Sequence, residues 1–257
     1  MFTAAPLLRF KSGNHICVFY RDESYLLELL ASYLAEGLLR GEKCFCAQKS
    51  EHLEQLKARL AYMGVSLKDE LRRGSLEIHT EAEVYFATGA FRPEEMMRLL
   101  ATAIAAAKAS GFTGLRTAGE MSWAADGHCD CDQLICYEAM VNESFPMQPV
   151  VGLCQYDMRC FSPELLARVL EQHSSSFAET GSRHFTFTIR SNGYVADVVA
   201  DRKNPQSRFY YVAQASNSVD VLGWGSEENF DNAVLGAESL LSTLRQPRAL
   251  GTIRRSS

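Results

Sequence analysis

The sequence predicts an α/β domain with a doubly wound, mainly parallel sheet, followed by a small α+β domain. Strand-like and helical patterns alternate along residues 12–173, and such alternation is typical of parallel strands joined by crossover helices. The runs CVFY and PVVGLC are almost continuously apolar, which indicates strands buried on both faces. After residue 173 the composition changes to short β-type runs separated by turn residues.

Each expected strand of the first domain is a short apolar run bounded by polar or turn residues. HICVFY is the first, KCFCAQ the second and PVVGLCQYD the last. The full set covers residues 15–20, 43–48, 75–80, 114–121 and 149–157.

Each expected helix combines apolar residues at helical spacing with a start or stop signal. We expect helices over residues 24–39, 50–60, 93–109, 131–145 and 162–173. Gly41 ends the first one, because glycine readily takes the left-handed conformation that terminates helices. Ser50 and Ser162 are N-cap residues. Pro93 suits a first helical turn, where its missing amide proton costs nothing.

The region after residue 173 is expected to hold a linker and a second domain. Residues 174–183 are small and polar, which favours a linker. Residues 184–245 contain β-type runs and a final amphipathic helix at about 227–244, which predict a small β-rich α+β domain. The tail at 246–257 is expected to be disordered.

The composition excludes several classes of protein. The chain has 257 residues, 47% of them hydrophobic, and a net charge of −5. A mildly acidic chain offers no electrostatic footprint for nucleic acid, so we expect no direct binding of DNA or RNA. No apolar run approaches a membrane span, and MFTAAPLLRFK lacks the features of a secretory signal. We therefore expect a cytoplasmic protein with no membrane contact.

The chain has 8 cysteines, and the expected reducing compartment argues against a disulfide framework. Four of them lie in apolar runs, where a free thiol behaves as a small hydrophobe: Cys17, Cys44, Cys46 and Cys154. The segment His128-Cys129-Asp130-Cys131, with Cys136 beyond it, leaves a metal or thiol sensor open as an alternative. Its C-x-C spacing is too tight for a usual zinc knuckle, so no metal site is assigned.

Several motifs of the first domain carry a family resemblance. H-x-C-x-F-Y begins at His15, G-L-x-x-G-E-K-C at Gly37, G-E-M-S-W-A at Gly119 and L-C-Q-Y-D at Leu153. Together they resemble the MEDS family, the methanogen/methylotroph sensory domain, over roughly residues 12–173. The resemblance implies the sensing of small organic or hydrocarbon-type molecules, among them C1 compounds. It also implies association with DNA-binding or histidine-kinase modules.

The same opening resembles the first βαβ unit of RecA-like and KaiC-like ATPases, but it lacks their phosphate-binding loop. A working loop has the pattern G-x-x-x-x-G-K-[ST], because glycine amides and a lysine hold the phosphates. This chain has Phe19-Tyr20-Arg21-Asp22-Glu23-Ser24 instead. Asp22 and Glu23 would repel a phosphate, so we expect no ATP hydrolysis and no cofactor. Binding of a nucleoside through its base is left open.

The candidate ligand site lies beyond the carboxyl ends of the strands, where doubly wound sheets bind their ligands. Aromatic walls with a few convergent polar groups suit a small, largely apolar molecule. The candidate residues are Tyr20, Arg21, Glu120, Ser122, Trp123, Tyr137, Gln155, Tyr156 and Asp157.

These residues also have a purely structural interpretation. The aromatic side chains can pack at strand ends or cover the sheet as part of the core. Glu120 and Asp157 can serve as helix N-caps or as ion-pair partners of Arg116 or Arg159. His15 begins the first strand at its amino end, so we expect a structural hydrogen bond there.

The sequence therefore predicts a non-catalytic sensing module that binds a small molecule and signals through a protein partner. No catalytic motif stands out. A protein-interaction scaffold without a ligand is the alternative from another class. A homodimer is left open, and the sequence identifies neither the ligand nor the partner.

Overall fold

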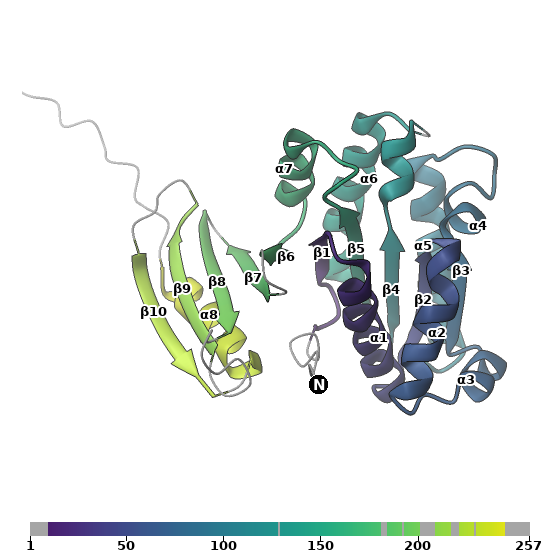
Figure 1. Ribbon diagram of the computed structural model, residues 1–257, viewed down its shortest axis with the longest axis horizontal. Coiled ribbons are helices and arrows are strands. Elements are labelled where there is room, and N and C mark those ends of the chain that lie inside the picture. The colour runs from purple at the N-terminus through teal and green to yellow at the C-terminus, as the bar shows by residue number, and fades with distance from the viewer. Residues whose placement is uncertain are drawn as a thin grey trace, which may run out of the picture. The chain divides into compact units, whose positions relative to one another are not determined.

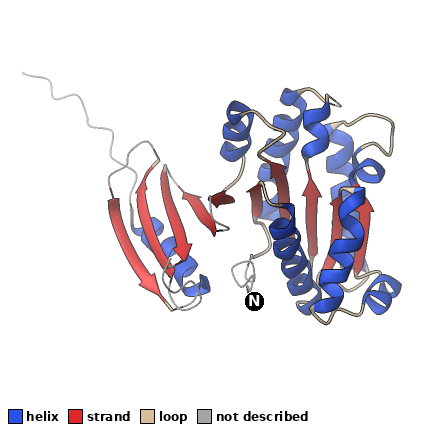
Figure 2. Ribbon diagram, viewed as in Figure 1, coloured by secondary structure: helices blue, strands red, loops and turns tan. Residues whose placement is uncertain are grey.

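The computed structural model describes residues 10–127, 129–180, 184–191, 193–200, 209–216, 221–228 and 230–244. The chain divides into two compact units, Met1–Phe185 and Thr186–Ser257. Figure 1 labels their helices and strands, and Figure 2 separates them by type of secondary structure. Each unit is described by itself.

The first unit is built on a parallel sheet with the strand order β6-β1-β5-β4-β2-β3. Its strands are β1 (His15–Tyr20), β2 (Lys43–Gln48), β3 (Leu76–Thr80), β4 (Leu115–Glu120), β5 (Val150–Asp157) and β6 (Ser175–Thr180). All residues of β1 and β5 are buried, as expected for strands covered on both faces. The predicted α/β fold class with a mainly parallel sheet is confirmed.

Helices cover both faces of this sheet (Figure 1). One face carries α1 (Glu23–Leu39) and α2 (Leu53–Tyr62), and the other carries α5 (Pro93–Ala109) and α6 (Cys131–Ser144). The remaining helical segments are α7 (Pro163–Glu171), α3 (Leu67–Arg73), α4 (Glu81–Tyr85), η2 (Ser50–His52), η3 (Ser122–Asp126) and η4 (Phe145–Met147). The predicted start signals hold at two helices: Pro93 opens α5, and the Ser162 side chain caps α7. The N-cap predicted at Ser50 is wrong, because Ser50 lies inside η2 and His52 precedes α2.

A buried arginine fixes α1 against the sheet. The Arg116 side chain is fully buried, and its Nε lies 2.5 Å from a carboxylate oxygen of Glu42. The guanidinium also lies 4.5 Å from the centre of the Tyr33 ring, in a cation–π contact. The Tyr33 hydroxyl donates to the carbonyls of Thr117 and Val151 at 3.1 Å each. A β-carbon at position 37 would lie only 2.5 Å from Arg116 Cδ, so a glycine is needed there.

The structure differs from the expected linker at residues 174–183. Residues 175–180 form β6, which pairs in parallel with β1. Its serines look like linker residues, but backbone pairing depends little on their side chains, and Phe177 is buried against Phe10 with ring centroids 5.9 Å apart. The sequence analysis also missed the short helices α3 and α4. The predicted disorder at 246–257 falls outside the described residues.

The second unit is an antiparallel sheet with one packed helix. Its strands are β7 (His184–Ser191), β8 (Tyr194–Ala200), β9 (Phe209–Ala215) and β10 (Val221–Glu227), each paired with the next in sequence. Helix α8 (Phe230–Thr243) packs on β8, β9 and β10. Its buried residues Ala233, Ala237 and Leu241 recur every four positions, as in an amphipathic helix. The predicted α+β class of this unit is confirmed.

The contact between α1 and Arg116 predicts the effect of Gly37→Ala. Alanine favours a helix over glycine by about 1 kcal/mol, but overpacking a filled core costs about 1–3 kcal/mol. Arg116 cannot withdraw without breaking its contact with Glu42, so we expect a net destabilisation of roughly 1–2 kcal/mol. Urea unfolding of the full chain measures it. Leu39→Ala, at an 84% exposed position of the same helix, is the control, and equal stability of Gly37→Ala and the wild type would contradict this packing.

Candidate functional site

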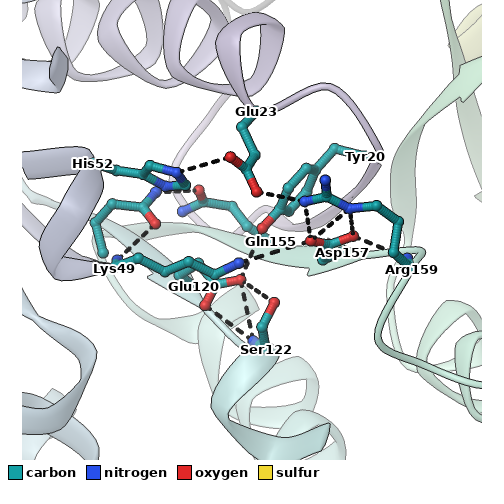
Figure 3. Close-up of polar contacts among 10 residues, drawn as sticks. Tyr20, Glu23, Lys49, His52, Glu120, Ser122, Gln155, Asp157 and Arg159 are labelled. Atoms are coloured by element: carbon teal, nitrogen blue, oxygen red, sulfur yellow. Dashed lines mark hydrogen bonds and ion pairs between the residues drawn. The ribbon is translucent and has the colours of Figure 1, made fainter.

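Polar side chains gather at the carboxyl ends of β1, β2, β4 and β5 (Figure 3). We call this set the strand-end network. It comprises Tyr20, Glu23, Gln48, Lys49, His52, Glu120, Ser122, Gln155, Asp157 and Arg159. Five of the predicted ligand-binding residues belong to it, and all five are buried: Tyr20, Glu120, Ser122, Gln155 and Asp157.

Glu120 at the end of β4 is the centre of one half of the network. Its carboxylate accepts hydrogen bonds from the Tyr20 hydroxyl at 3.0 Å and from the Ser122 hydroxyl at 2.5 Å. The Ser122 amide lies 3.1 Å from each carboxylate oxygen. Burial raises the pKa of Glu120 to about 7, although these donors and the Lys49 charge oppose the shift. The carboxyl group therefore exchanges its proton near neutral pH.

Asp157 and Arg159 at the end of β5 organise the other half. Arg159 donates to both Asp157 oxygens, with Nε at 2.8 Å from Oδ1 and Nη2 at 2.5 Å from Oδ2. The same Nη2 reaches Glu23 at 2.5 Å, and His52 lies 3.2 Å from the other oxygen of Glu23. Burial raises the pKa of Asp157, but the hydrogen bonds and charge of Arg159 outweigh it and leave that pKa below its usual value. The ion-pair interpretation of Asp157 is therefore correct for Arg159.

The ion-pair interpretation of Glu120 with Arg116 is wrong, because Arg116 points to the α1 face of the sheet and pairs with Glu42. Lys49 lies between the two halves of the network, because its Nζ atom is 3.7 Å from Asp157 Oδ2 and its charge opposes the rise in the pKa of Glu120.

The network also contains a glutamine pair. Gln48 Nε2 donates to Gln155 Oε1 at 3.0 Å. The Gln155 Nε2 atom is buried without a hydrogen-bond partner in the described part of the chain, so one donor of the network is unused.

The segment after β1 places two acidic side chains, Asp22 and Glu23, at the N-terminus of α1. Asp22 caps α1, since its side chain accepts a hydrogen bond from the Tyr25 amide at 3.2 Å. Glu23 lies in the first turn and pairs with Arg159. Acidic side chains of the protein itself thus compensate the partial positive charge of the helix N-terminus.

The other predicted site residues lie elsewhere. Trp123 and Tyr137 belong to an aromatic group, in which the Phe91 ring centroid lies 4.6 Å from that of Trp123 and 5.6 Å from that of Tyr137. Tyr156 is fully buried and donates its hydroxyl to Glu138. Arg21 is exposed. The structure thus brings only part of the predicted set together.

An apolar cavity of about 60 Å³ lies between the sheet and the helices α5 and α6. Residues of β2, β4 and β5 form its floor, and α5 and α6 form its roof. Its lining includes Tyr85, Met96, Leu100, Tyr137, Val141 and Phe145. His15 and Cys154 also line it. Of the predicted site residues, Tyr137 lines this cavity.

The sequence analysis missed a buried group of side chains next to this cavity. His15, Glu138, Cys154 and His173 each offer one ligand atom, and these atoms all lie within 4.8 Å of one another. His15 is hydrogen-bonded as expected, and its partners are the carboxylate of Glu138 and the thiol of Cys154. The signal was present in two motifs, since H-x-C-x-F-Y and L-C-Q-Y-D lie on the neighbouring strands β1 and β5.

The cysteine segment before α6 has a different structural role. Asp130 caps α6 in a capping box with Gln133, while Cys131 and Cys136 are exposed. His128 falls outside the described residues. The ligand atoms that the described residues bring together include no atom of Cys129, Cys131 or Cys136. The four cysteines predicted to be buried, Cys17, Cys44, Cys46 and Cys154, are all buried.

Among the described residues, no helix is long and apolar enough to cross a membrane.

Comparison with known proteins gives a family and a relative. The family model "MEDS: MEthanogen/methylotroph, DcmR Sensory domain" matches residues 14–174. The transcriptional repressor DcmR of Methylorubrum extorquens is 27% identical over 175 residues. The match covers 64% of this chain and 59% of the repressor, so the chain spans less than two thirds of the relative's length.

Two solved structures show weaker similarity. The flagellar accessory protein FlaH from Methanocaldococcus jannaschii has a TM-score of 0.48 and 12% identity, covering 84% of this chain and 90% of its own. The KaiC-like protein PH0186 from Pyrococcus horikoshii has a TM-score of 0.49 and 12% identity, covering 83% and 91%. The fold class follows from the strand order of the sheet rather than from these similarities.

The raised pKa of Glu120 predicts a pH dependence of stability. A carboxyl group whose pKa is higher in the folded state than in the unfolded state contributes its full stabilisation at pH values below the unfolded-state pKa. This contribution is lost as the pH rises through the folded-state pKa. Between about pH 5 and pH 8 the free energy of unfolding should fall by roughly 2–3 kcal/mol through this group. Glu120→Gln should remove that part of the slope.

Urea unfolding of the full chain at several pH values measures the effect. Glu164→Gln, at an exposed position of α7, is the matched control and should keep the wild-type slope. The same slope in Glu120→Gln and the wild type would show that Glu120 does not titrate in this range.

Proposed function

The chain belongs to the MEDS family of sensory domains, and from this premise we propose that its first unit binds a small, largely apolar molecule without converting it. The observation that carries the proposal is the apolar cavity between the sheet and the helices α5 and α6.

The size and lining of the cavity favour a molecule of few atoms. Its volume is about 60 Å³, and a single water molecule occupies about 10–15 Å³ on the same measure. Aliphatic and aromatic side chains form most of the lining, with Thr117 and His15 as polar exceptions. In such a site the burial of apolar surface stabilises a bound ligand, and few side chains could react with that ligand.

The strand-end network supports a ligand site away from the crevice in which doubly wound sheets usually bind nucleotides. Its side chains lie beyond the strand ends and hydrogen-bond to one another. Asp22 and Glu23 add negative charge at the N-terminus of α1. A triphosphate at this place would compete with Asp157 and Glu23 for Arg159, and breaking a buried ion pair costs several kcal/mol. The proposed ligand site is therefore the cavity rather than the crevice. Of the site residues predicted from the sequence, Tyr137 is the one that would contact the ligand there.

Ligand occupancy is proposed to act through a protein partner. The relative DcmR is a transcriptional repressor, which supports a regulatory role for this chain. The second unit is the surface that we propose for the partner, because it follows the sensory domain in the chain.

We expect the full chain to gain thermal stability with small apolar molecules and none with Mg·ATP. Halomethanes, short alcohols and benzene are the probes for a thermal-shift series. A molecule present at 100 times its Kd should stabilise the folded chain by about 2.7 kcal/mol. Ala103→Phe, which fills the cavity from α5, should abolish the response. Ala106→Phe, at an exposed position of the same helix, should keep it.

Two results would contradict the proposal. One is stabilisation by micromolar Mg·ATP with release of phosphate, which would make the chain an ATPase. The other is a response of equal size in Ala103→Phe and the wild type, which would place the ligand outside the cavity.

A further inference from the structure

The buried group next to the cavity combines the side chains that transition metals prefer. His15 lies on β1, Glu138 on α6 and Cys154 on β5, and His173 follows α7. The exposed fractions are 1% for His15, 0% for Glu138, 8% for Cys154 and 2% for His173. Imidazole, thiolate and carboxylate are the ligands of zinc and related ions.

Three contacts within this group have the length expected around a tetrahedral ion, and the contact between His15 and Glu138 is shorter. Bonds of about 2.0–2.3 Å separate the ligand atoms of such an ion by roughly 3.3–3.8 Å. The Cys154 Sγ atom lies 3.4 Å from His15 Nε2 and 3.6 Å from Glu138 Oε2. The His173 Nε2 atom lies 3.4 Å from the same Glu138 oxygen, and His15 Nε2 lies 3.0 Å from it. A small outward movement of His15 would make room for the ion.

Outer contacts hold two of the four ligands, His173 and Glu138, in a binding orientation. His173 Nδ1 lies 2.8 Å from the Val169 carbonyl oxygen, a contact that directs Nε2 into the group. The Tyr156 hydroxyl donates to Glu138 Oε1, which leaves Oε2 facing the histidines and the thiol. Metal-binding histidines and carboxylates in proteins are typically held by such partners.

The charges of the group also favour a dication. Within the described part of the chain, the ion pairs of Glu138 are with histidines, and none is with a lysine or an arginine. Burial raises the pKa of the Cys154 thiol well above its usual value, but a coordinated thiol loses its proton outright. One carboxylate, one thiolate and two neutral imidazoles around a divalent cation sum to zero charge. Ionised groups are buried at the lowest free-energy cost when their charges sum to zero.

We propose that His15, Glu138, Cys154 and His173 bind one divalent transition metal ion, with zinc as the ion best matched to this ligand set. As the metal–sulfur bond forms, the thiol proton leaves to solvent and the oxidation state of the metal is unchanged. His15 and Cys154 also line the apolar cavity, so the proposed metal site adjoins it. This proposal stands apart from the small-molecule function and does not depend on it.

Metal analysis of the full chain tests the proposal first. The protein is purified without a histidine tag or chelator, and we expect about one zinc ion per chain. Replacement of zinc by cobalt(II) should give the visible bands of a tetrahedral ion together with a near-ultraviolet thiolate-to-cobalt band. These two measurements need no variant, so they decide the matter even if a ligand variant fails to fold.

Ligand variants then locate the ion. Cys154→Ser should lose the thiolate-to-cobalt band, and it should bind zinc more than 100-fold more weakly, because loss of an outer partner alone costs about 10–100-fold. His173→Gln should weaken zinc binding in the same way. Cys46→Ser, which replaces a buried thiol on β2, and the double variant Cys129→Ser/Cys131→Ser should leave both the band and the affinity unchanged.

Either of two outcomes overturns the proposal. One is a wild-type chain that holds no metal and takes up neither zinc nor cobalt in a saturable manner. The other is a thiolate-to-cobalt band that survives Cys154→Ser and disappears in the Cys129→Ser/Cys131→Ser variant, which would place the ion at the segment before α6.

Discussion

The carboxylates of Glu120, Glu138 and Asp157 are almost completely removed from solvent, and the organisation of the first unit follows from how each is compensated. A buried charge without a partner costs several kcal/mol. Asp157 has the bidentate contact of Arg159. Glu120 has hydroxyl and amide donors and a pKa near neutrality. Glu138 has histidines, a thiol and a tyrosine hydroxyl.

This compensation also links separate elements at the strand ends. Arg159 reaches Asp157 and Glu23 together, so the end of β5 and the start of α1 are joined by an ion pair of the protein itself. The apolar cavity lies between the sheet and the helices α5 and α6, and mainly apolar side chains surround it. The charged contacts of the first unit thus lie at the strand ends, while the lining of the cavity is mainly apolar.

Local patterns were enough to predict most of the fold. The predicted and observed boundaries agree for the strand HICVFY and for α5, which begins at Pro93 and ends at Ala109. They agree because burial on both faces and helical periodicity are patterns of neighbouring residues. Strand β6 was missed because its pairing with β1 depends on contacts that its serines do not reveal. The candidate site was predicted in part: the topology placed Tyr20, Glu120 and Gln155 together, but no local spacing joins His15 to Cys154, since 139 positions separate them.

A crystal structure of the full chain soaked with dibromomethane tests the central claim most directly, because bromine can be located by its anomalous scattering. The account predicts anomalous density in the cavity between β4 and α5, close to Leu100 and Tyr137, and none beside the strand-end network. Bromine density against Tyr20–Ser24, with the cavity empty, would contradict it.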